Sequence, residues 1–468
     1  MAVEETRVST FARVEAILRS NEVYELATLI PEREKGDAGR PADFPMYMMF
    51  VFEALISVFE SARKAETEIA DRNMWRFIQR IVKKVHKRKP ELWLPSQRYK
   101  RHHYTYWRNR YMTDPVILAM IQEKHREIAA RQALELGLLD PDGDGSFTHP
   151  SLDRLVYGDG KVVTPLYKAK PGTTRVDKET GEIKPVRFEA DADLHMEGTG
   201  EMEFGVKFLM SAVRTKDVHG RIILDAQHVP DKGGEAKVAM QSFHAIAPLI
   251  PGALGAIYDG ALRGMHHAEL MRDLGWLSIN RVTAKEVAAR DGKPVKRVEK
   301  TTHIEDKQVK GRTVRLYAKG GALGIVELTE TGEQEFVELR RVRTMRQVDN
   351  QGRFRFYNEY ALPDGGSVTV RLDTTEQDKE RKLNRSENVR QIAPGDPDFV
   401  RVYKRRSDAE SINRALEDTL WLGRAHSKGA RRQLVNLIGF SIMTNSLAVF
   451  LHRSRRNDED SEGNQMAA

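Results

Sequence analysis

Apolar residues at helical spacing dominate the first 135 residues of the chain. One run places them every three or four positions, on a single face of a helix: Met49, Phe52, Leu55, Ile56 and Phe59. Pro41 and Pro45 precede this run, where prolines commonly begin helices. A second run follows after a break, with Ile69, Trp75, Phe77 and Ile78. The pattern predicts a helical domain over residues 1–135, whose short helices suit a helix-turn-helix-like bundle.

Strands and helices alternate between about 150 and 282. Strands are predicted in RLVYGDGKVV, FGVKFLMSAVRT and RIILDAQHV, and a helix in EAKVAMQSFHAI. A short buried strand, GALGAIYD, ends at Asp259 and is followed by a helix, GMHHAELMRDLG, and a further strand, WLSINRV. Antiparallel strands followed by a strand–helix–strand unit resemble the first part of an RNase H-like sheet.

Residues 283–395 carry short alternating segments split by Gly, Asp and Asn, and these predict a meander of antiparallel strands. The segments are RTVRLYAKG, LGIVELTET, QEFVELRRVRTMRQV, GRFRFYNEYAL and SVTVRLD. Helical character returns over 396–456, so the meander is interpreted as a β-rich insertion in a catalytic domain of mixed α/β type. Residues 457–468 are acidic and polar and predict a disordered tail. The fold class expected for the whole chain is α+β.

The apolar run from Leu434 to Leu451 approaches the length of a membrane span. Asn436, Gly439 and Asn445 interrupt it, and basic residues flank it. A buried core helix can be this apolar, so we expect such a helix and no membrane insertion.

The 468 residues provide for several domains, and their net charge of +8 favours anionic partners. The chain has no cysteine, which excludes disulfide scaffolds and thiolate zinc sites and agrees with a reducing cytoplasm. The N-terminus lacks the long apolar core of a secretory signal. We therefore expect a cytoplasmic protein.

Positive charge is concentrated between Ile81 and Tyr111, where ten Lys or Arg residues stand against one acid, Glu91. Tyr and Trp residues interleave with these cations. Cations neutralise phosphates and aromatic rings stack on bases, so the segment predicts DNA binding through Arg98, Lys100, Arg101, Arg108 and Arg110. The alternative is a solvated basic face whose aromatic side chains turn into a core.

Three acids are candidates for metal-assisted phosphoryl transfer: Asp159, Asp259 and Glu410. Such chemistry requires carboxylates that converge from distant positions on Mg²⁺, which prefers oxygen ligands. Each acid also has a structural interpretation: Asp159-Gly160 as a turn, Asp259 as a cap, and Glu410 as a first-turn helix acid. Spacing leaves rival acids open, namely Asp191, Asp193, Asp408 and Glu417.

The C-terminal stretch resembles the signature of bacterial insertion-sequence transposases of the DDE type, which is Tyr, two residues, Arg, three residues, Glu, six residues, Lys. Tyr403, Arg406 and Glu410 match it in register. The last position holds Glu417 instead of Lys, and Arg414 is a substitute one turn after Glu410. YGDGKVVTP and the strand–Asp–helix–strand around Asp259 are similar to the segments that carry the two aspartates in this family.

The resemblance implies an RNase H-like catalytic domain of the retroviral-integrase superfamily, preceded by a helical N-terminal DNA-binding domain. It implies that Asp159, Asp259 and Glu410 hold two Mg²⁺ or Mn²⁺ ions, while Tyr403, Arg406 and Arg414 contact DNA. The expected activity is strand cleavage and strand transfer at the terminal inverted repeats of an insertion sequence. The expected setting is a homodimer on double-stranded DNA at the prokaryotic nucleoid.

Two alternatives remain at this point: a DNA-binding relative that has lost transposition, and a metal-dependent nuclease without strand transfer. A calcium loop is not expected around Asp140, Asp142 and Asp144, because its twelfth position is Ser151 where a bidentate Glu is needed. The adjacent histidine pairs at 102–103 and 266–267 do not share a helix face, so no zinc site is expected there.

Overall fold

This computed structural model describes residues 8–31, 43–87, 94, 96–196, 201–282 and 300–466, with side chains as far as 457. The chain forms two compact units. The first combines Met1–Leu138, Gly160–Ser242 and Ser411–Ala468, and the second combines Leu139–Asp159 and Phe243–Glu410. Strand β1 (Leu155–Val163), helix α8 (Glu235–Ile246) and helix α13 (Arg406–Glu417) each begin in one unit and end in the other.

The N-terminal part of the first unit is helical, as the apolar spacing predicts. Its helices are α1 (Thr10–Arg19), α2 (Asn21–Ala27), α3 (Tyr47–Val58), α4 (Ala62–Ala70), α5 (Arg72–His86), α6 (Arg101–Trp107) and α7 (Pro115–Glu135). Side chains at the starts of these helices explain the boundaries. Asp71 accepts hydrogen bonds from the first amides of α5, and Asp114 does the same for α7.

Helix α14 (Ala430–Met466) is the core helix of the first unit, and it packs against α1, α3 and strand β6 (Arg221–His228). Its stretch Ala430–Asn457 is long and apolar enough to cross a membrane, yet 83% of its most apolar window is buried inside the protein. The polar interruptions have partners there. Asn436 donates to Glu53, and Asn445 both accepts from and donates to the Ile223 backbone.

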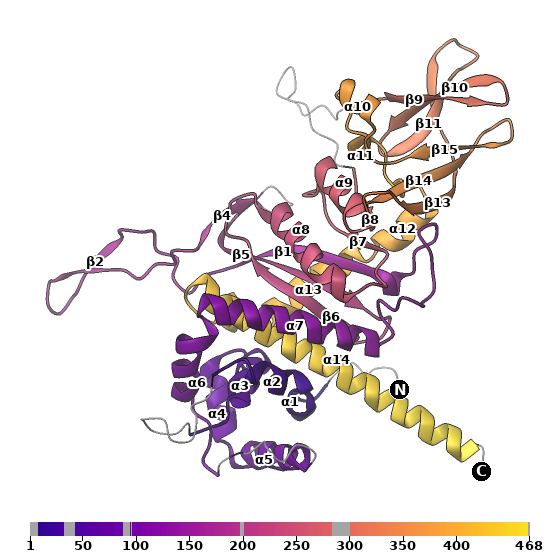
Figure 1. The fold of residues 1–468 in the computed structure, drawn as a ribbon. Helices are drawn as coiled ribbons and strands as arrows, with labels where there is room; N and C mark the ends of the chain where they lie inside the picture. The colour runs from indigo at the N-terminus through magenta and orange to yellow at the C-terminus, as the bar shows by residue number, and fades with distance from the viewer. Residues whose placement is uncertain are drawn as a thin grey trace. The chain divides into compact units, whose positions relative to one another are not determined.

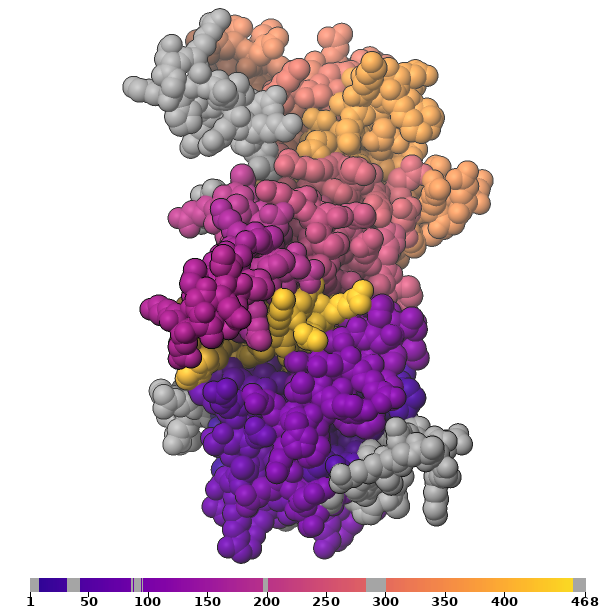
Figure 2. All heavy atoms as spheres, turned by 90° about the vertical axis from the view of Figure 1, so that its left-hand side faces the viewer, coloured from indigo at the N-terminus to yellow at the C-terminus, as the bar shows by residue number. Residues whose placement is uncertain are grey.

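Figure 2 shows α14, in yellow, between the violet N-terminal helices and the magenta residues that follow β1. These segments all belong to the first unit. The tail that the sequence predicted to be disordered from 457 is the end of this helix as far as Met466.

The strands of the first unit are β4 (Asp193–Met196), β5 (Met202–Arg214) and β6, and both neighbours pair with β5 in antiparallel fashion. The end of β1 lies against β5, because a Cβ at Gly205 would come within 2.5 Å of the Val163 carbonyl oxygen. A separate two-stranded ribbon, β2 (Thr174–Val176) and β3 (Ile183–Pro185), extends from this part of the chain (Figure 1).

In the second unit the start of β1 pairs in parallel with β7 (Gly255–Ile257), and β7 pairs in parallel with β8 (Leu277–Ile279). Helix α9 (Gly264–Arg272) connects β7 to β8, which confirms the predicted strand–helix–strand. With the pairings of β1 in both units, the hydrogen-bonded order is β4-β5-β1-β7-β8, with β6 also beside β5.

The segment predicted as a meander forms two antiparallel sheets. The first has the order β12-β11-β10-β9, and its strands are β9 (Thr302–Val309), β10 (Arg312–Lys319), β11 (Ala322–Leu328) and β12 (Gln334–Glu338). The second contains β13 (Arg341–Val348), β14 (Phe354–Ala361) and β15 (Ser367–Arg371). Strand β9 is an addition to the predicted set, and the single predicted segment over 334–348 divides into β12 and β13 because Leu339 turns into the core.

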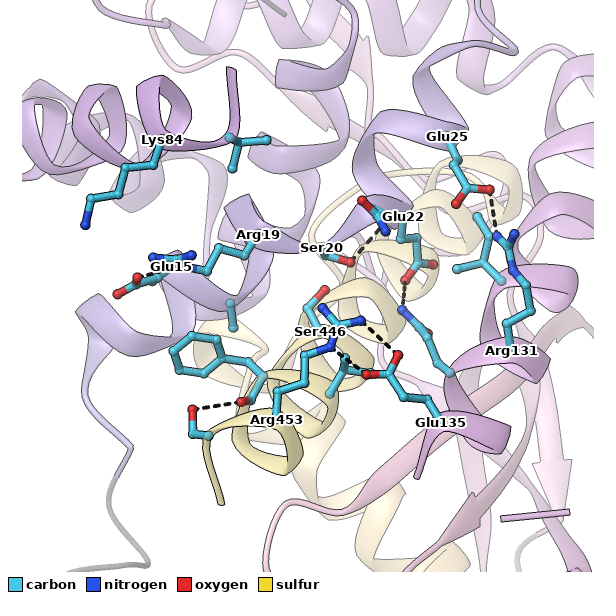
Figure 3. A pocket seen from close by; sticks show the side chains of 18 of the residues that line it. Glu15, Arg19, Ser20, Glu22, Glu25, Lys84, Arg131, Glu135, Ser446 and Arg453 are labelled. Atoms are coloured by element: carbon cyan, nitrogen blue, oxygen red, sulfur yellow. Dashed lines mark hydrogen bonds and ion pairs between the residues drawn. The ribbon is translucent and has the colours of Figure 1, made fainter. Parts of the chain in front are cut away.

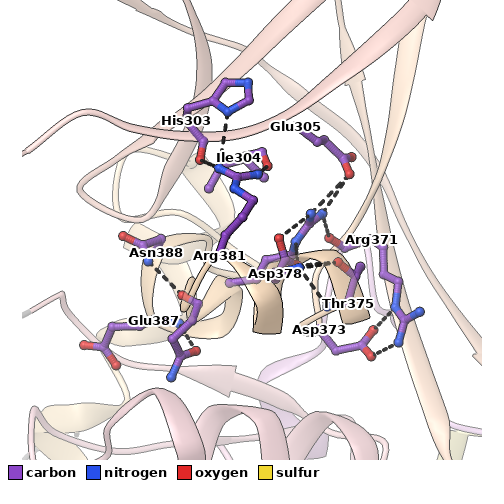
Figure 4. Close-up of polar contacts among 12 residues, drawn as sticks. His303, Ile304, Glu305, Arg371, Asp373, Thr375, Asp378, Arg381, Glu387 and Asn388 are labelled. Carbon is purple, nitrogen blue, oxygen red and sulfur yellow. Dashed lines mark hydrogen bonds and ion pairs between the residues drawn. The ribbon is translucent and has the colours of Figure 1, made fainter.

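A buried arginine holds this β-rich segment to the short helices α10 (Glu376–Glu380) and α11 (Arg385–Asn388). Arg385 is only 2% exposed, and its guanidinium donates to Asp378, to Glu305 and to the Arg371 carbonyl (Figure 4). Two carboxylates and one carbonyl satisfy the buried charge, so removing one of these partners would destabilise the junction. From α11, Glu387 accepts a hydrogen bond from the Gly264 amide at the start of α9.

Candidate active site

Asp159 and Asp259 lie together in the second unit because their strands are in register. Tyr157 of β1 is opposite Ile257 of β7, and each aspartate stands two residues further along its strand. Since parallel strands advance together, the two side chains emerge at the same edge of the sheet. A carboxylate oxygen of Asp159 accordingly lies within 4.8 Å of one of Asp259.

The backbone around Asp259 holds this carboxylate in place. Its Oδ1 accepts a hydrogen bond from the Ala261 amide at 2.8 Å, an Asx-type turn. The buried Asn280, just after β8, donates to the Asp259 carbonyl at 3.3 Å. Asp259 therefore forms the local turn with one oxygen of its carboxylate.

Helix α13 adds Arg406 and Glu410 to the two aspartates. The Arg406 guanidinium donates to Asp159 Oδ1 at 3.0 Å and lies 3.8 Å from Glu410 Oε1, one helical turn along. Arg406 and Asp159 are largely buried, with side chains 16% and 13% exposed, whereas the Glu410 side chain is 70% exposed. The structure thus joins Glu410 to the site through Arg406.

Helix α12 (Pro397–Tyr403) positions the remaining signature residue. Tyr403 stacks on Phe399 with ring centroids 4.9 Å apart, and the Arg281 guanidinium lies 5.2 Å from the Tyr403 ring centre. The buried Arg341 of β13 binds Asp396 and Asp398, which fixes the start of α12. The β-rich insertion therefore supports the helix that carries Tyr403.

Burial and neighbouring charges shift the pKa values of Arg406 and Tyr403. Burial by itself lowers the pKa of Arg406, but the carboxylates of Asp159, Asp259 and Glu410 raise that pKa above its usual value. Burial raises the pKa of Tyr403, while Arg406 and Arg281 oppose that rise. Arg406 is therefore a permanent cation, and Tyr403 keeps its proton near neutral pH.

The donor set fits a hard divalent cation. Two carboxylates within 4.8 Å, those of Asp159 and Asp259, offer the oxygen ligands that Mg²⁺ and Mn²⁺ prefer. Glu410, the third acid that the sequence singled out, is not among the carboxylates that lie within this distance of both.

Glu417 stands where the resemblance leads us to expect a lysine, and it lies in the first unit. Glu417 pairs with Lys161 of strand β1 at 2.6 Å. Arg414, the suggested substitute for the signature lysine, is exposed on α13.

The rival acids serve other purposes. Asp191 accepts from the Ala430 amide at the start of α14, Asp193 bonds the adjacent Leu194 amide, and Asp408 pairs with Arg405. Asp140 accepts from the Asp142 amide in an Asx turn. An acid that the sequence did not single out is Glu235 of α8, which lies against Gly160 and pairs with Lys207 at 2.6 Å.

The predicted DNA-binding cations divide into two groups. Arg98, Lys100, Arg101 and Arg110 are exposed, but Arg108 points inward and donates to Ser427 Oγ at 2.8 Å. Tyr99 and Tyr104 are 1% exposed, so their rings belong to the core, as the alternative interpretation of this segment holds. Arg88, Lys89 and Trp93 lie outside the described residues.

Helix α5 carries a basic stripe that sequence reasoning recognised only at its end. Six exposed cations follow the helical repeat, with no acid between them: Arg72, Arg76, Arg80, Lys83, Lys84 and Lys87. The opposite face of α5 is buried through Trp75, Ile78 and Val82. The periodicity of the arginines, one every four residues from 72, was the signal that could have found this stripe.

A cavity of about 1060 Å³ lies in the first unit and is lined by none of the predicted site residues. Figure 3 shows its walls, where Arg131 pairs with Glu25 and Arg453 with Glu135. Its charges neutralise one another, so the cavity is a polar groove without strong preference for either sign of ligand.

Comparisons with known proteins add nothing to the geometry of the candidate site. No protein-family model matches the chain, and no curated protein matches it either.

Proposed function

We propose that this protein is a DDE transposase, which cleaves DNA strands and transfers them at the terminal inverted repeats of its insertion sequence with the help of divalent metal ions. The observation that carries the proposal is the register of β1 and β7. It brings Asp159 and Asp259 together, with Arg406 bound to the first.

The sheet supports an RNase H-like catalytic domain. Numbered along the chain without the short β4, its five strands have the order 3-2-1-4-5: β6, β5, β1, β7 and β8. Strands β6 and β5 are antiparallel neighbours, and β7 and β8 run parallel to β1. Each aspartate stands on or directly after a central strand of this sheet, which supplies the rigid placement that catalysis requires.

The chain's own residues divide the work at a scissile phosphate. Divalent ions, when bound, activate a hydroxyl nucleophile and stabilise the leaving oxygen. Asp159, Asp259 and Glu410 supply carboxylate ligands. Arg406 offers a guanidinium fork to phosphate oxygens, and Tyr403 with Arg281 flanks that fork with a ring and a second cation.

The first test is cleavage of duplexes that carry the inverted repeats flanking the gene, in Mg²⁺. Hydroxyl-terminated 3′ ends with joined products support the transposase. Ends without joining favour a metal-dependent nuclease, and a gel shift without cleavage favours a DNA-binding relative.

The matched variant is Asp259→Asn, because an amide oxygen can still accept from Ala261 and preserve the turn. Cleavage should fall at least about a hundredfold, since even outer partners of metal ligands cost this much, while DNA affinity stays the same. Cleavage at the wild-type rate would remove Asp259 from the site.

A further inference from the structure

The ribbon β2–β3 belongs to an arm, residues 164–188, that the proposed catalytic mechanism does not use. It leaves the sheet after β1, and a bridge between Lys168 and Phe188 joins its two sides near the root. Figure 1 shows it extending away from the strands of the first unit, in which the arm lies.

The root of the arm is fixed to the start of α14. Just beyond the arm, Glu189 is 3% exposed and its Oε2 accepts from the Gly429 amide at 2.9 Å. Asp191 Oδ2 accepts from the Ala430 amide at 2.7 Å. Lys428 lies 5.6 Å from the centre of the Phe188 ring. Anchoring at a helix start holds the direction of the arm, which lowers the entropy cost of binding through it.

The shaft of the arm is exposed on both faces. Every residue from Pro171 to Val176 is exposed, and Val176 and Ile183, opposite each other in the ribbon, are 63% and 72% exposed. A two-stranded ribbon is at best marginally stable by itself in water. A ribbon of this kind gains stability when a partner covers it.

Charge is distributed unevenly along the arm. The shaft has five cations and no acid over 164–176 and 183–188: Lys168, Lys170, Arg175, Lys184 and Arg187. The three acids are confined to the turn, at Asp177, Glu179 and Glu182, where Lys178 joins them. Arg175 and Lys184 stand directly opposite each other on one face. The turn acids offset the Lys184 charge, because Lys184 Nζ lies 2.7 Å from Asp177 and 3.5 Å from Glu182. Arg175 opposite it adds a charge that an anionic partner would neutralise.

We propose that the arm binds double-stranded DNA, with its cationic shaft against the phosphates that border a groove. This rests on the proposed function, which makes DNA the substrate. The major groove admits a two-stranded β-ribbon. The nine residues from Lys168 to Val176 include a turn at Pro171 and Gly172, so they span less than the roughly 26 Å of eight fully extended steps at roughly 3.3 Å each. A second copy of this arm is a poorer partner, because two five-cation shafts repel.

Site-directed crosslinking tests the proposed DNA-binding surface directly. The chain contains no cysteine, so a single Thr174→Cys change carries a photo-activated crosslinker with no other site to remove. The probe is a random-sequence duplex in EDTA, where DNA is bound but not cleaved. Crosslinks to DNA are expected from Thr174→Cys. The control is Val218→Cys, also exposed and placed in the turn at the far end of β5, and it should crosslink weakly.

Neutralising the shaft tests the energetics. In the triple variant Lys170→Gln, Arg175→Gln, Lys184→Gln, affinity for the same duplex should fall about tenfold or more. The slope of log K against log salt should become shallower by about one unit for each phosphate that the variant no longer neutralises. The control Glu179→Gln leaves the ion pairs of Lys184 with Asp177 and Glu182 in place and should bind at least as tightly as the wild type.

Two results overturn the proposal: an unchanged affinity and slope in the triple variant, or equal crosslinking from both cysteines. Loss of self-association in Val176→Ser, Ile183→Ser, with unchanged DNA affinity in the triple variant, would assign the arm to a second copy instead. The binding and crosslinking assays contain no divalent metal, so they can be interpreted even if the protein does not cleave DNA. A negative result in these assays likewise says nothing against cleavage at the candidate active site.

Discussion

At the scale of single residues, pairings between distant positions decide which charges are available for chemistry. Arg406 lies 3.0 Å from Asp159 and 3.8 Å from Glu410 in the candidate site, whereas Glu417 is paired with Lys161. Glu417 is thus a structural ion-pair partner on α13. Its charge offsets that of a lysine two positions after the first aspartate.

The pairing predicts the effect of replacing Glu417 by lysine. Glu417→Lys places an ammonium where Lys161 Nζ lies 2.6 Å from the carboxylate. We expect a loss of about 1 kcal/mol in the free energy of unfolding, the upper end for a partly exposed pair, measured by denaturant titration. The double variant Lys161→Glu, Glu417→Lys should recover most of the loss. A single variant as stable as the wild type would contradict the pairing.

At the scale of elements, close backbone approach sets how β5 meets β1. A Cβ at Gly205 would lie 2.5 Å from the Val163 carbonyl oxygen. Because this oxygen belongs to the backbone of β1, relieving the clash requires a shift of the strand. Gly205→Ala should cost about 1–3 kcal/mol, the usual range for overpacking, as seen in the denaturation midpoint. Gly160→Ala is the matched control. Its Cβ would meet the end of the Glu235 side chain, which can rotate, so its loss should be smaller.

Helix α5 supplies a second prediction at this scale. Arg72, Arg76 and Arg80 form one exposed row, so replacing all three by Gln should flatten the salt dependence of DNA binding by about one unit for each phosphate left without its cation. The corresponding triple change at Arg98, Lys100 and Arg101 tests the segment that the sequence favoured. Comparing the two slopes in one titration identifies which surface neutralises more phosphates. An unchanged slope would exclude the tested surface.

At the scale of the whole molecule, buried neutral histidines make stability depend on pH. Burial lowers the pKa of His267 from its ordinary 6.5 to about 2, helped by the nearby Arg390 charge, and His267 is 2% exposed. Below about pH 6.5 the unfolded chain binds a proton that the folded chain does not, so stability is present above that pH and is lost as pH falls. Burial likewise lowers the pKa of His426 to about 4.

The measurable consequence is a steeper loss of stability in mild acid. For His267 the slope approaches about 1.4 kcal/mol per pH unit below pH 6. His267→Gln, whose amide can keep the hydrogen bond to Ser278 Oγ, should remove this contribution between about pH 6 and 4. Denaturant titrations at several pH values measure it. Parallel curves for variant and wild type would contradict it.

The local pattern of apolar and polar residues was sufficient to predict most helices and strands and to single out the candidate acids. Apolar spacing predicted α3, α14 and the short strand β7, because burial of one face or of a whole segment leaves a periodic trace in the sequence. It also predicted the strand–helix–strand around Asp259. The sequence did not predict strand β9 or the break between β12 and β13, because exposed, charged strands show little alternation of apolar and polar residues.

Only the tertiary structure decided which residues meet. The parallel register of β1 and β7 joins residues a hundred positions apart, and no local pattern fixes that register. The tertiary structure also decided that Arg108 and Tyr104 turn inward and that α5 presents a row of exposed cations. It likewise decided that Glu417 forms an ion pair with Lys161. Sequence by itself determined the kinds of elements and the chemistry on offer. The packing of those elements decided the partners, because contacts between distant segments depend on the whole core rather than on neighbouring residues.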